Sequence, residues 1–177
     1  MYQKAAAETS NENAQYDLAL LYEEGEEIVE DLEKDFYWYQ ESAKNGNKFA
    51  QYKLGLYYQN GWGIEKNEDK AFEWYEKSAK QDNGDAQSYL GFFYKHGIVI
   101  EEDLEKAFYW YQKSAENGNR IAQYNLGNFY RYGWGIKKDE NEASKWYKKL
   151  AGQDNKFFIK NNDLLGTVYM FFKFFNL

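Results

Sequence analysis

The fold of this chain is decided by residues 50–83, AQYKLGLYYQNGWGIEKNEDKAFEWYEKSAKQDN. The pattern recurs with a period of 36 residues, so that its leading Ala-Gln pair begins at Ala14, Ala50, Ala86 and Ala122. A glycine follows eleven residues after each of these alanines, and a Trp-Tyr pair follows the glycine. A fixed period of this length is typical of arrays in which each unit buries its apolar face against its neighbours. Such arrays are mostly binding surfaces, so the pattern favours binding over catalysis.

One unit contains the pattern of two helices. Apolar residues recur at intervals of three and four from Ala50 to Tyr58, and again from Ala71 to Ala79. Gly61 stands where a left-handed helix end is expected, and Asn67 is a good N-cap for the second helix. The residues equivalent to Asn67 in the other repeats, Asp31, Asp103 and Asp139, are also capping types. Asn83 ends the unit and can cap the first helix of the next one. The Trp-Tyr pair of the second helix is predicted to belong to the core.

We therefore predict an all-α fold, a right-handed α-solenoid of helix–loop–helix repeats. The solenoid is expected over 1–155, with an orphan second helix at 1–10 and repeats at 11–46, 47–82, 83–118 and 119–154. One departure is Asp35, which replaces a small alanine and is expected to weaken packing in the first repeat. We expect residues 156–177 to form a degenerate, Phe-rich helix that either caps the array or presents an apolar patch for docking or self-association.

The composition excludes several classes of site. The chain has 177 residues, no cysteine and one histidine, which excludes Cys-ligated zinc sites, Cys nucleophiles and disulfides. The position of His96 is occupied by Glu24, Asn60 and Tyr132 in the other repeats, as expected for a surface position. We predict no catalytic residue, no metal and no cofactor. A net charge of −7 also disfavours nucleic acid as a partner.

The charge is uneven along the chain. Residues 8–45 hold twelve acidic and two basic side chains, whereas 131–160 hold eight basic and four acidic ones. These are either solvated faces or a surface that orients a polar partner or a second copy. The chain begins without an apolar secretory segment, and Leu164–Leu177 is too short to span a bilayer. We therefore expect a cytoplasmic protein with no membrane span.

The repeats resemble the Sel-one-like repeat (SLR) family, a relative of the tetratricopeptide repeats. The second unit carries the resemblance through Ala50, Leu54, Gly55, Tyr58, Gly61, Gly63, Ile64, Lys70, Ala71, Trp74, Tyr75, Lys77, Ser78 and Ala79. The resemblance implies a non-catalytic adaptor that binds a protein or peptide, with a kinase-linked signalling complex as one setting. The alternative is a fragment of a larger SLR adaptor in protein degradation or cell-wall regulation. A hydrolase is less favoured, because the relatives reported as hydrolases are rich in cysteine pairs.

Binding is expected on the concave face, which the first helices line in tetratricopeptide-like arrays. Three variable positions of each first helix are predicted to face it, and they are occupied in the four repeats by Tyr16, Tyr52, Ser88 and Tyr124; by Leu20, Leu56, Phe92 and Asn128; and by Glu23, Gln59, Lys95 and Arg131. All of these except Ser88 are our candidate contact residues. The alternative is that some of the tyrosines only fill space between adjacent repeats. Trp62 and Trp134, in the loops, are either loop anchors or contact residues.

Overall fold

The structure, a computed structural model, describes residues 11–24 and 32–152. The predicted orphan helix at 1–10 and the C-terminal segment 156–177 lie outside the described residues. So do Gly25 and Asp31, the expected caps of the first repeat.

Every regular element in the described part of the chain is an α-helix. The elements are α2 (Glu12–Glu24), α3 (Leu32–Lys44), α4 (Lys48–Asn60), α5 (Glu68–Ala79), α6 (Gly84–His96), α7 (Leu104–Glu116), α8 (Arg120–Tyr132) and α9 (Glu140–Gly152). They form four hairpins, each made of a first helix (α2, α4, α6 or α8) and a second helix (α3, α5, α7 or α9).

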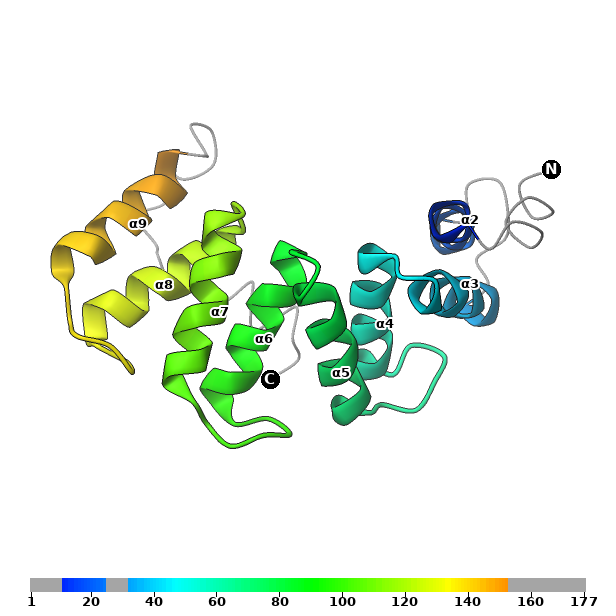
Figure 1. Ribbon diagram of the computed structural model, residues 1–177, viewed down its shortest axis with the longest axis horizontal. Helices are drawn as coiled ribbons and strands as arrows, with labels where there is room; N and C mark the ends of the chain where they lie inside the picture. Colours follow the sequence, from blue (N-terminus) through cyan, green and yellow to red (C-terminus); the bar gives the residue numbers. More distant parts are fainter. Residues whose placement is uncertain (1–10, 25–31, 153–177) are drawn as a thin grey trace.

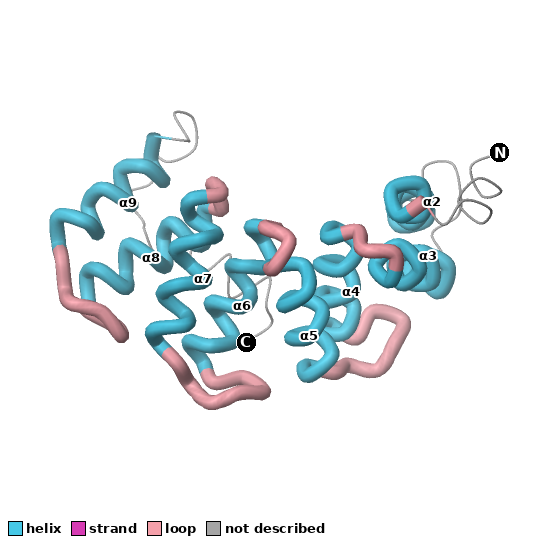
Figure 2. Tube along the Cα trace, viewed as in Figure 1, coloured by secondary structure: helices cyan, strands magenta, loops and turns pink. Residues whose placement is uncertain are grey.

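The hairpins follow one another across the molecule in chain order, in a shallow arc from α2 at one end to α9 at the other (Figure 1). Each helix packs on the next along the chain. The longer loops within hairpins lie at one edge of the array, and the short turns between hairpins lie at the opposite edge (Figure 2). The predicted all-α solenoid is confirmed.

Helix ends are set by the residues that recur at them. Asn47, Asn83 and Asn119 precede first helices, and each side-chain Oδ1 accepts a hydrogen bond from the backbone N–H three residues on. The first helices α4, α6 and α8 end at glycines whose φ lies between 61° and 72°. Only glycine enters this left-handed region without steric cost, which explains why it recurs at this position.

Second helices are capped in the same way. Asn67, Asp103 and Asp139 stand before α5, α7 and α9, and each side chain accepts a hydrogen bond from a backbone N–H of the first turn. The backbone N–H of each of these three residues also bonds to the carbonyl of a tyrosine in the preceding first helix. The predicted N-caps of these helices are confirmed, and the cap residue also closes the loop.

The core is built around the tyrosine of each Trp-Tyr pair. Tyr39, Tyr75 and Tyr111 are fully buried between the two helices of their hairpins. Facing Tyr111 is Gly91 of α6, where a Cβ would lie only 2.8 Å from atoms of the ring. The absent side chain therefore allows the two helices to close on the aromatic ring.

The tryptophan of each pair differs from the prediction, because it is only half-buried. Trp74 packs one side against the core between the first two repeats, and the Nζ of Lys77 lies 4.0 Å from its ring centroid. A tryptophan at this position shields the core from the outside, while its tyrosine neighbour fills the interior.

Polar side chains join the helices at the turn edge. The Nε2 of Gln51, Gln87 and Gln123 donates to the carbonyl of an alanine at the end of the preceding second helix: Ala43, Ala79 and Ala115. A serine of each of the first three second helices donates to a carbonyl at the start of its own first helix: Ser42 to Glu12, Ser78 to Lys48 and Ser114 to Gly84. The glutamine bonds give a further donor to carbonyls of the last helical turn, where intrahelical donors run out, and the serine bonds join the two helices of each hairpin.

The first hairpin departs from the others inside its core. Asp35 is fully buried in α3, at the position occupied by Ala71, Ala107 and Ala143 in the other second helices. Ala19 of α2 occupies the position that is Gly91 in α6, and it is fully buried as well.

Candidate protein-binding face

The eleven candidate residues lie on the first helices, and none belongs to the fully buried core. Arg131 is exposed, and the other ten are half-buried. Ser88, which shares a position with three of the tyrosines, is buried instead. The candidates therefore form a partly accessible face along α2, α4, α6 and α8, which we call the first-helix face.

Side-chain contacts connect this face from one repeat to the next. The ring centroids of Tyr16 on α2 and Phe49 on α4 are 6.0 Å apart, and those of Tyr52 on α4 and Tyr89 on α6 are 5.9 Å apart. Glu23 accepts two hydrogen bonds from Lys53, at 2.7 and 2.8 Å. α6 also contacts α8 directly. First helices thus touch their counterparts in neighbouring repeats.

The position shared by Glu23, Gln59, Lys95 and Arg131 has a structural role that the sequence analysis missed. The hydroxyl of Tyr39 donates to the carboxylate of Glu23, and that of Tyr75 donates to Oε1 of Gln59 at 2.5 Å. In the fourth hairpin the corresponding tyrosine, Tyr147, donates to Oδ1 of Asn128 at 2.7 Å. In these three hairpins a residue of the first-helix face accepts the hydrogen bond of the inward-facing tyrosine.

Burial and local charge perturb the ionisation of these tyrosines. Burial raises the pKa of the Tyr39 hydroxyl well above its usual range, and the hydrogen bond to the Glu23 carboxylate raises it further. Burial also raises the pKa of Tyr147, whereas the charge of Arg131 and its hydrogen bond lower it. The tyrosines therefore act as neutral hydrogen-bond donors.

The predicted tyrosines both line the face and pack on the core. Tyr16, Tyr52 and Tyr124 lie against the inward-facing tyrosines of their hairpins, with ring centroids 5.8 to 6.2 Å apart. These three tyrosines therefore fill space against the core and also remain partly exposed on the face. The two roles, which were alternatives in the sequence analysis, occur together.

The third repeat places its tyrosine one residue later. Tyr89 stacks on Tyr75 of the preceding repeat, with ring centroids 4.6 Å apart and an interplanar angle of 14°. Equivalent positions of the repeats point to Ser88, so Tyr89 is not among the predicted residues. The signal for it is the aromatic residue one position later, where Asp17, Lys53 and Asn125 stand in the other repeats.

The two loop tryptophans differ in their surroundings. Trp134 packs edge-on against Phe129 and stacks on Tyr132, with ring centroids 5.6 and 5.0 Å apart. Trp62 packs edge-on against Tyr57 at 5.4 Å but remains 43% exposed. Trp134 is therefore the more firmly anchored of the two.

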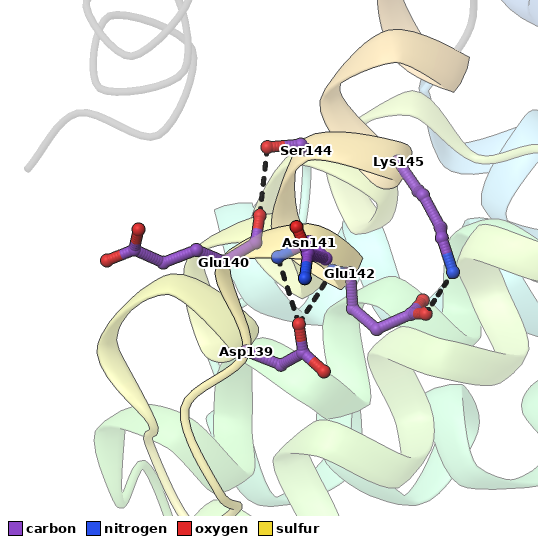
Figure 3. A network of polar contacts seen from close by, with 6 residues as sticks. All are labelled: Asp139, Glu140, Asn141, Glu142, Ser144 and Lys145. Atoms are coloured by element: carbon purple, nitrogen blue, oxygen red, sulfur yellow. Dashed lines mark hydrogen bonds and ion pairs between the residues drawn. The ribbon is translucent and has the colours of Figure 1, made fainter.

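The start of α9 accounts for the acidic pair Asp139–Glu140. Asp139 caps the helix by accepting from the backbone N–H groups of Asn141 and Glu142, and Glu142 pairs with Lys145 (Figure 3). Glu140 lies 2.8 Å from Lys138, whose ammonium lowers the pKa of that carboxyl. These carboxylates serve as a cap and as exposed ion pairs, without the apolar surroundings that acid–base catalysis uses to raise a pKa.

Repetition of the hairpins with these caps and polar contacts agrees with a family assignment from the sequence. The Sel1 repeat family matches residues 13–47, 48–83, 84–119 and 120–155. The chain belongs to the Sel1 repeat family. Sel1 repeat proteins are generally non-catalytic scaffolds for protein–protein interactions.

Two solved Sel1 repeat structures are similar in both sequence and fold. A Sel1 repeat protein from Oxalobacter formigenes is 35% identical with a TM-score of 0.77, over 81% of this chain and 57% of that one. A protective antigen of uropathogenic Escherichia coli strains, which displays an SLR fold, is 34% identical with a TM-score of 0.80, over 86% of this chain and 32% of that one. This chain therefore spans about half or less of the length of these two Sel1 repeat proteins.

Cysteine-rich protein B of Helicobacter pylori shares the Sel1-type fold alone, at 24% identity and a TM-score of 0.56, over 75% of this chain and 95% of that one. No curated protein matches the chain. Within the described residues, no helix combines the length and apolar character that crossing a bilayer requires.

Proposed function

We propose that this Sel1 repeat chain is a scaffold that binds a peptide or protein segment along the first-helix face. The observation that carries the proposal is the partial exposure of all eleven candidates, at positions repeated in register over four helices. Tyrosine recurs there and arginine is present once, as Arg131; both types are enriched among the residues that dominate binding energy.

The contacts between first helices support placing this face on the inside of the arc. In a curved array, elements on the inner side lie closer to their counterparts than those on the outer side. The contacts from α2 to α4, from α4 to α6 and from α6 to α8 fit the inner side. A partner segment lying there would contact several repeats at once, which explains how weak contacts at each repeat add up to useful affinity.

An affinity capture tests the proposal. The full chain is immobilised and exposed to native extract, and retained proteins are quantified by mass spectrometry. A Tyr16→Ala/Tyr124→Ala variant removes two rings of the first-helix face. Tyr109→Ala is the matched control, because Tyr109 is 49% exposed but lies on a second helix.

We expect a stoichiometric partner on the wild type and on the control, and its loss from the double variant. Thermal unfolding of all three chains is measured in parallel, so that loss of folding is distinguished from loss of binding. A partner that survives the double change but is lost from Tyr109→Ala would place binding on the second helices and overturn the proposal.

The identity of the partner tests the setting. We propose a signalling complex linked to a kinase, with protein degradation and cell-wall regulation as the alternatives. A captured kinase or kinase-binding protein would support the first, and a component of either other process would replace it.

A further inference from the structure

A cluster of cations and aromatic rings lies where the loop after α8 meets the end of α6. It consists of Lys95 and His96 from α6, Arg131 and Tyr132 from α8, and Trp134 from the loop, and we call it the basic–aromatic cluster. The Nζ of Lys95 is 4.4 Å from the centroid of the Trp134 ring. Tyr132 stacks on the same tryptophan, and the guanidinium of Arg131 lies 5.5 Å from the centroid of the Tyr132 ring.

The cations of this cluster lack carboxylate partners within the described ranges. Lys44, Lys53, Lys66, Lys80, Lys106, Lys138 and Lys145 each form an ion pair with Asp or Glu. Lys95 and Arg131 instead face aromatic rings, and Arg131 also bonds to the hydroxyl of Tyr147. In a chain of net charge −7, two adjacent repeats thus present cations that form no ion pair with a carboxylate of the described residues.

Lys95 is also partly removed from water. Its side chain is half-buried, and burial lowers the pKa of its ammonium. A desolvated cation without a counter-ion is energetically unfavourable, so an anion that bonds to it would relieve that cost. Two carboxylates act on the cluster through their charge: Glu102 on His96, and Glu140, which pairs with Lys138, on Arg131.

We propose that the basic–aromatic cluster binds an acidic peptide segment, whose Asp or Glu carboxylates pair with Lys95 and Arg131. Apolar side chains of the same segment would lie on Trp134 and Tyr132. This inference rests on the proposed scaffold function and specifies the chemistry of its partner at one end of the first-helix face. A mixed surface of cations and rings suits carboxylates interleaved with apolar side chains better than an isolated anion.

The experiment is a titration of the full chain with synthetic peptides, followed by heteronuclear NMR. The probe is acetyl-Glu-Glu-Leu-Glu-Glu-Leu-amide, and its counterpart has glutamine in place of every glutamate. Inorganic phosphate forms the third arm. The indole N–H signal of Trp134, identified by its absence in Trp134→Phe, reports on the cluster, and that of Trp74 reports on the second helices.

The glutamate peptide should shift the Trp134 signal saturably, and the glutamine peptide and phosphate should not. Arg131→Gln alters an exposed side chain and should weaken binding about tenfold, as expected for the loss of one charge-assisted contact. Lys95→Gln should weaken it at least as much. Lys77→Gln is the matched control, because it removes a lysine lying 4.0 Å from the ring centroid of Trp74 on α5, and it should leave binding unchanged.

Three results would overturn the inference: equal binding of the glutamine peptide, equal loss of affinity in Lys77→Gln, or phosphate shifts at Trp134 as large as those of the peptide. Its failure remains separate from that of the proposed function. A captured partner that depends on Tyr16 and Tyr124 but not on Arg131 would keep the scaffold and remove the acidic segment.

Discussion

The first and third hairpins share most of their second-helix sequence but differ at several interior or near-interior positions, including three that change a small or a charged residue. α3 reads LEKDFYWYQESAK and α7 reads LEKAFYWYQKSAE, with the same aromatic residues in the same register. The third hairpin has Ala107, Gly91 and Lys95 where the first has Asp35, Ala19 and Glu23. The shared aromatic pattern therefore sets the fold of a repeat, while a few interior positions with small side chains set how closely its helices pack.

The two hairpins also differ in the contacts made by the residue at the position of Glu23 and Lys95. In the first hairpin the Tyr39 hydroxyl donates to Glu23, which in turn pairs with Lys53 of the next repeat. In the third hairpin the residue equivalent to Glu23 is Lys95, which faces Trp134 of the next repeat. The same position therefore connects neighbouring repeats through an ion pair at one end of the array and through a cation–aromatic contact near the other.

The largest change in stability is expected when the buried aspartate of the first hairpin is introduced at the equivalent position of the third. Ala107→Asp places a carboxylate at a fully buried position of α7, in the core that α7 shares with α8, and should lower the free energy of unfolding by roughly 3 kcal/mol or more. Urea unfolding followed by circular dichroism measures the change. The reciprocal Asp35→Ala should change stability by less, and equal tolerance of aspartate at both positions would remove this difference between the hairpins.

The next effect tests the close approach at Gly91. Gly91→Ala introduces a Cβ 2.8 Å from the buried Tyr111 ring and should destabilise the chain by about 1–3 kcal/mol, although alanine favours a helix. Gly152→Ala in α9 is the control, because no described atom beyond its chain neighbours and its own helix backbone lies within 4 Å of the added Cβ, and it should be neutral or slightly stabilising. If both substitutions stabilise equally, helix propensity outweighs packing at Gly91.

A contact shared by the two hairpins should give equal effects. Ser42 and Ser114 each donate to a backbone carbonyl of their own first helix, that of Glu12 and that of Gly84. Ser42→Ala and Ser114→Ala should each lower the free energy of unfolding by about 1 kcal/mol, because each removes one side-chain hydrogen bond between the two helices of its hairpin. Hydrogen exchange of the two hairpins resolves the losses locally. A much larger loss in one hairpin would show that this hydrogen bond is not equivalent in the two hairpins.

The smallest effect concerns the charge that distinguishes the two hairpins. Burial and the neighbouring Lys95 ammonium lower the pKa of His96 below 6.5, whereas Glu102 raises it. An NMR titration should find the pKa moving upward in Lys95→Gln and downward in Glu102→Gln. Because the unfolded chain binds this proton more tightly, the contribution of His96 to stability rises with pH through the window just below 6.5 and is lost as pH falls through it. Shifts in the same direction for both variants would contradict the assigned causes.

Much of the fold was predictable because its determinants are local. Asn67 and Asp103 act as caps and Gly61 as a left-handed helix end through interactions within a few residues, so the sequence shows them directly. The first-helix face was predictable for a related reason: residues at equivalent repeat positions share one side of their helices.

What the sequence did not reveal depends on contacts between elements. In the third repeat the tyrosine of this face stands at position 89 and not at the equivalent position 88, and its ring stacks on Tyr75 of the preceding repeat. The pairing of Lys95 with Trp134 depends on the path of a loop one repeat further on. Neither distance follows from spacing along the chain, and the tryptophans of the Trp-Tyr pairs were assigned to the core because periodicity does not distinguish half-burial from burial.

The glutamine and serine hydrogen bonds at the turn edge recur at equivalent positions from one repeat to the next. Gln87 donates to Ala79 behind it and accepts from Asn117 ahead of it, and Gln51 does the same with Ala43 and Gln81. A repeat inserted in register could form the same hydrogen bonds with the repeat before it and the repeat after it. Such a chain can lengthen by duplication without first evolving a new interface, and each added unit would extend the surface available to a partner by one further step.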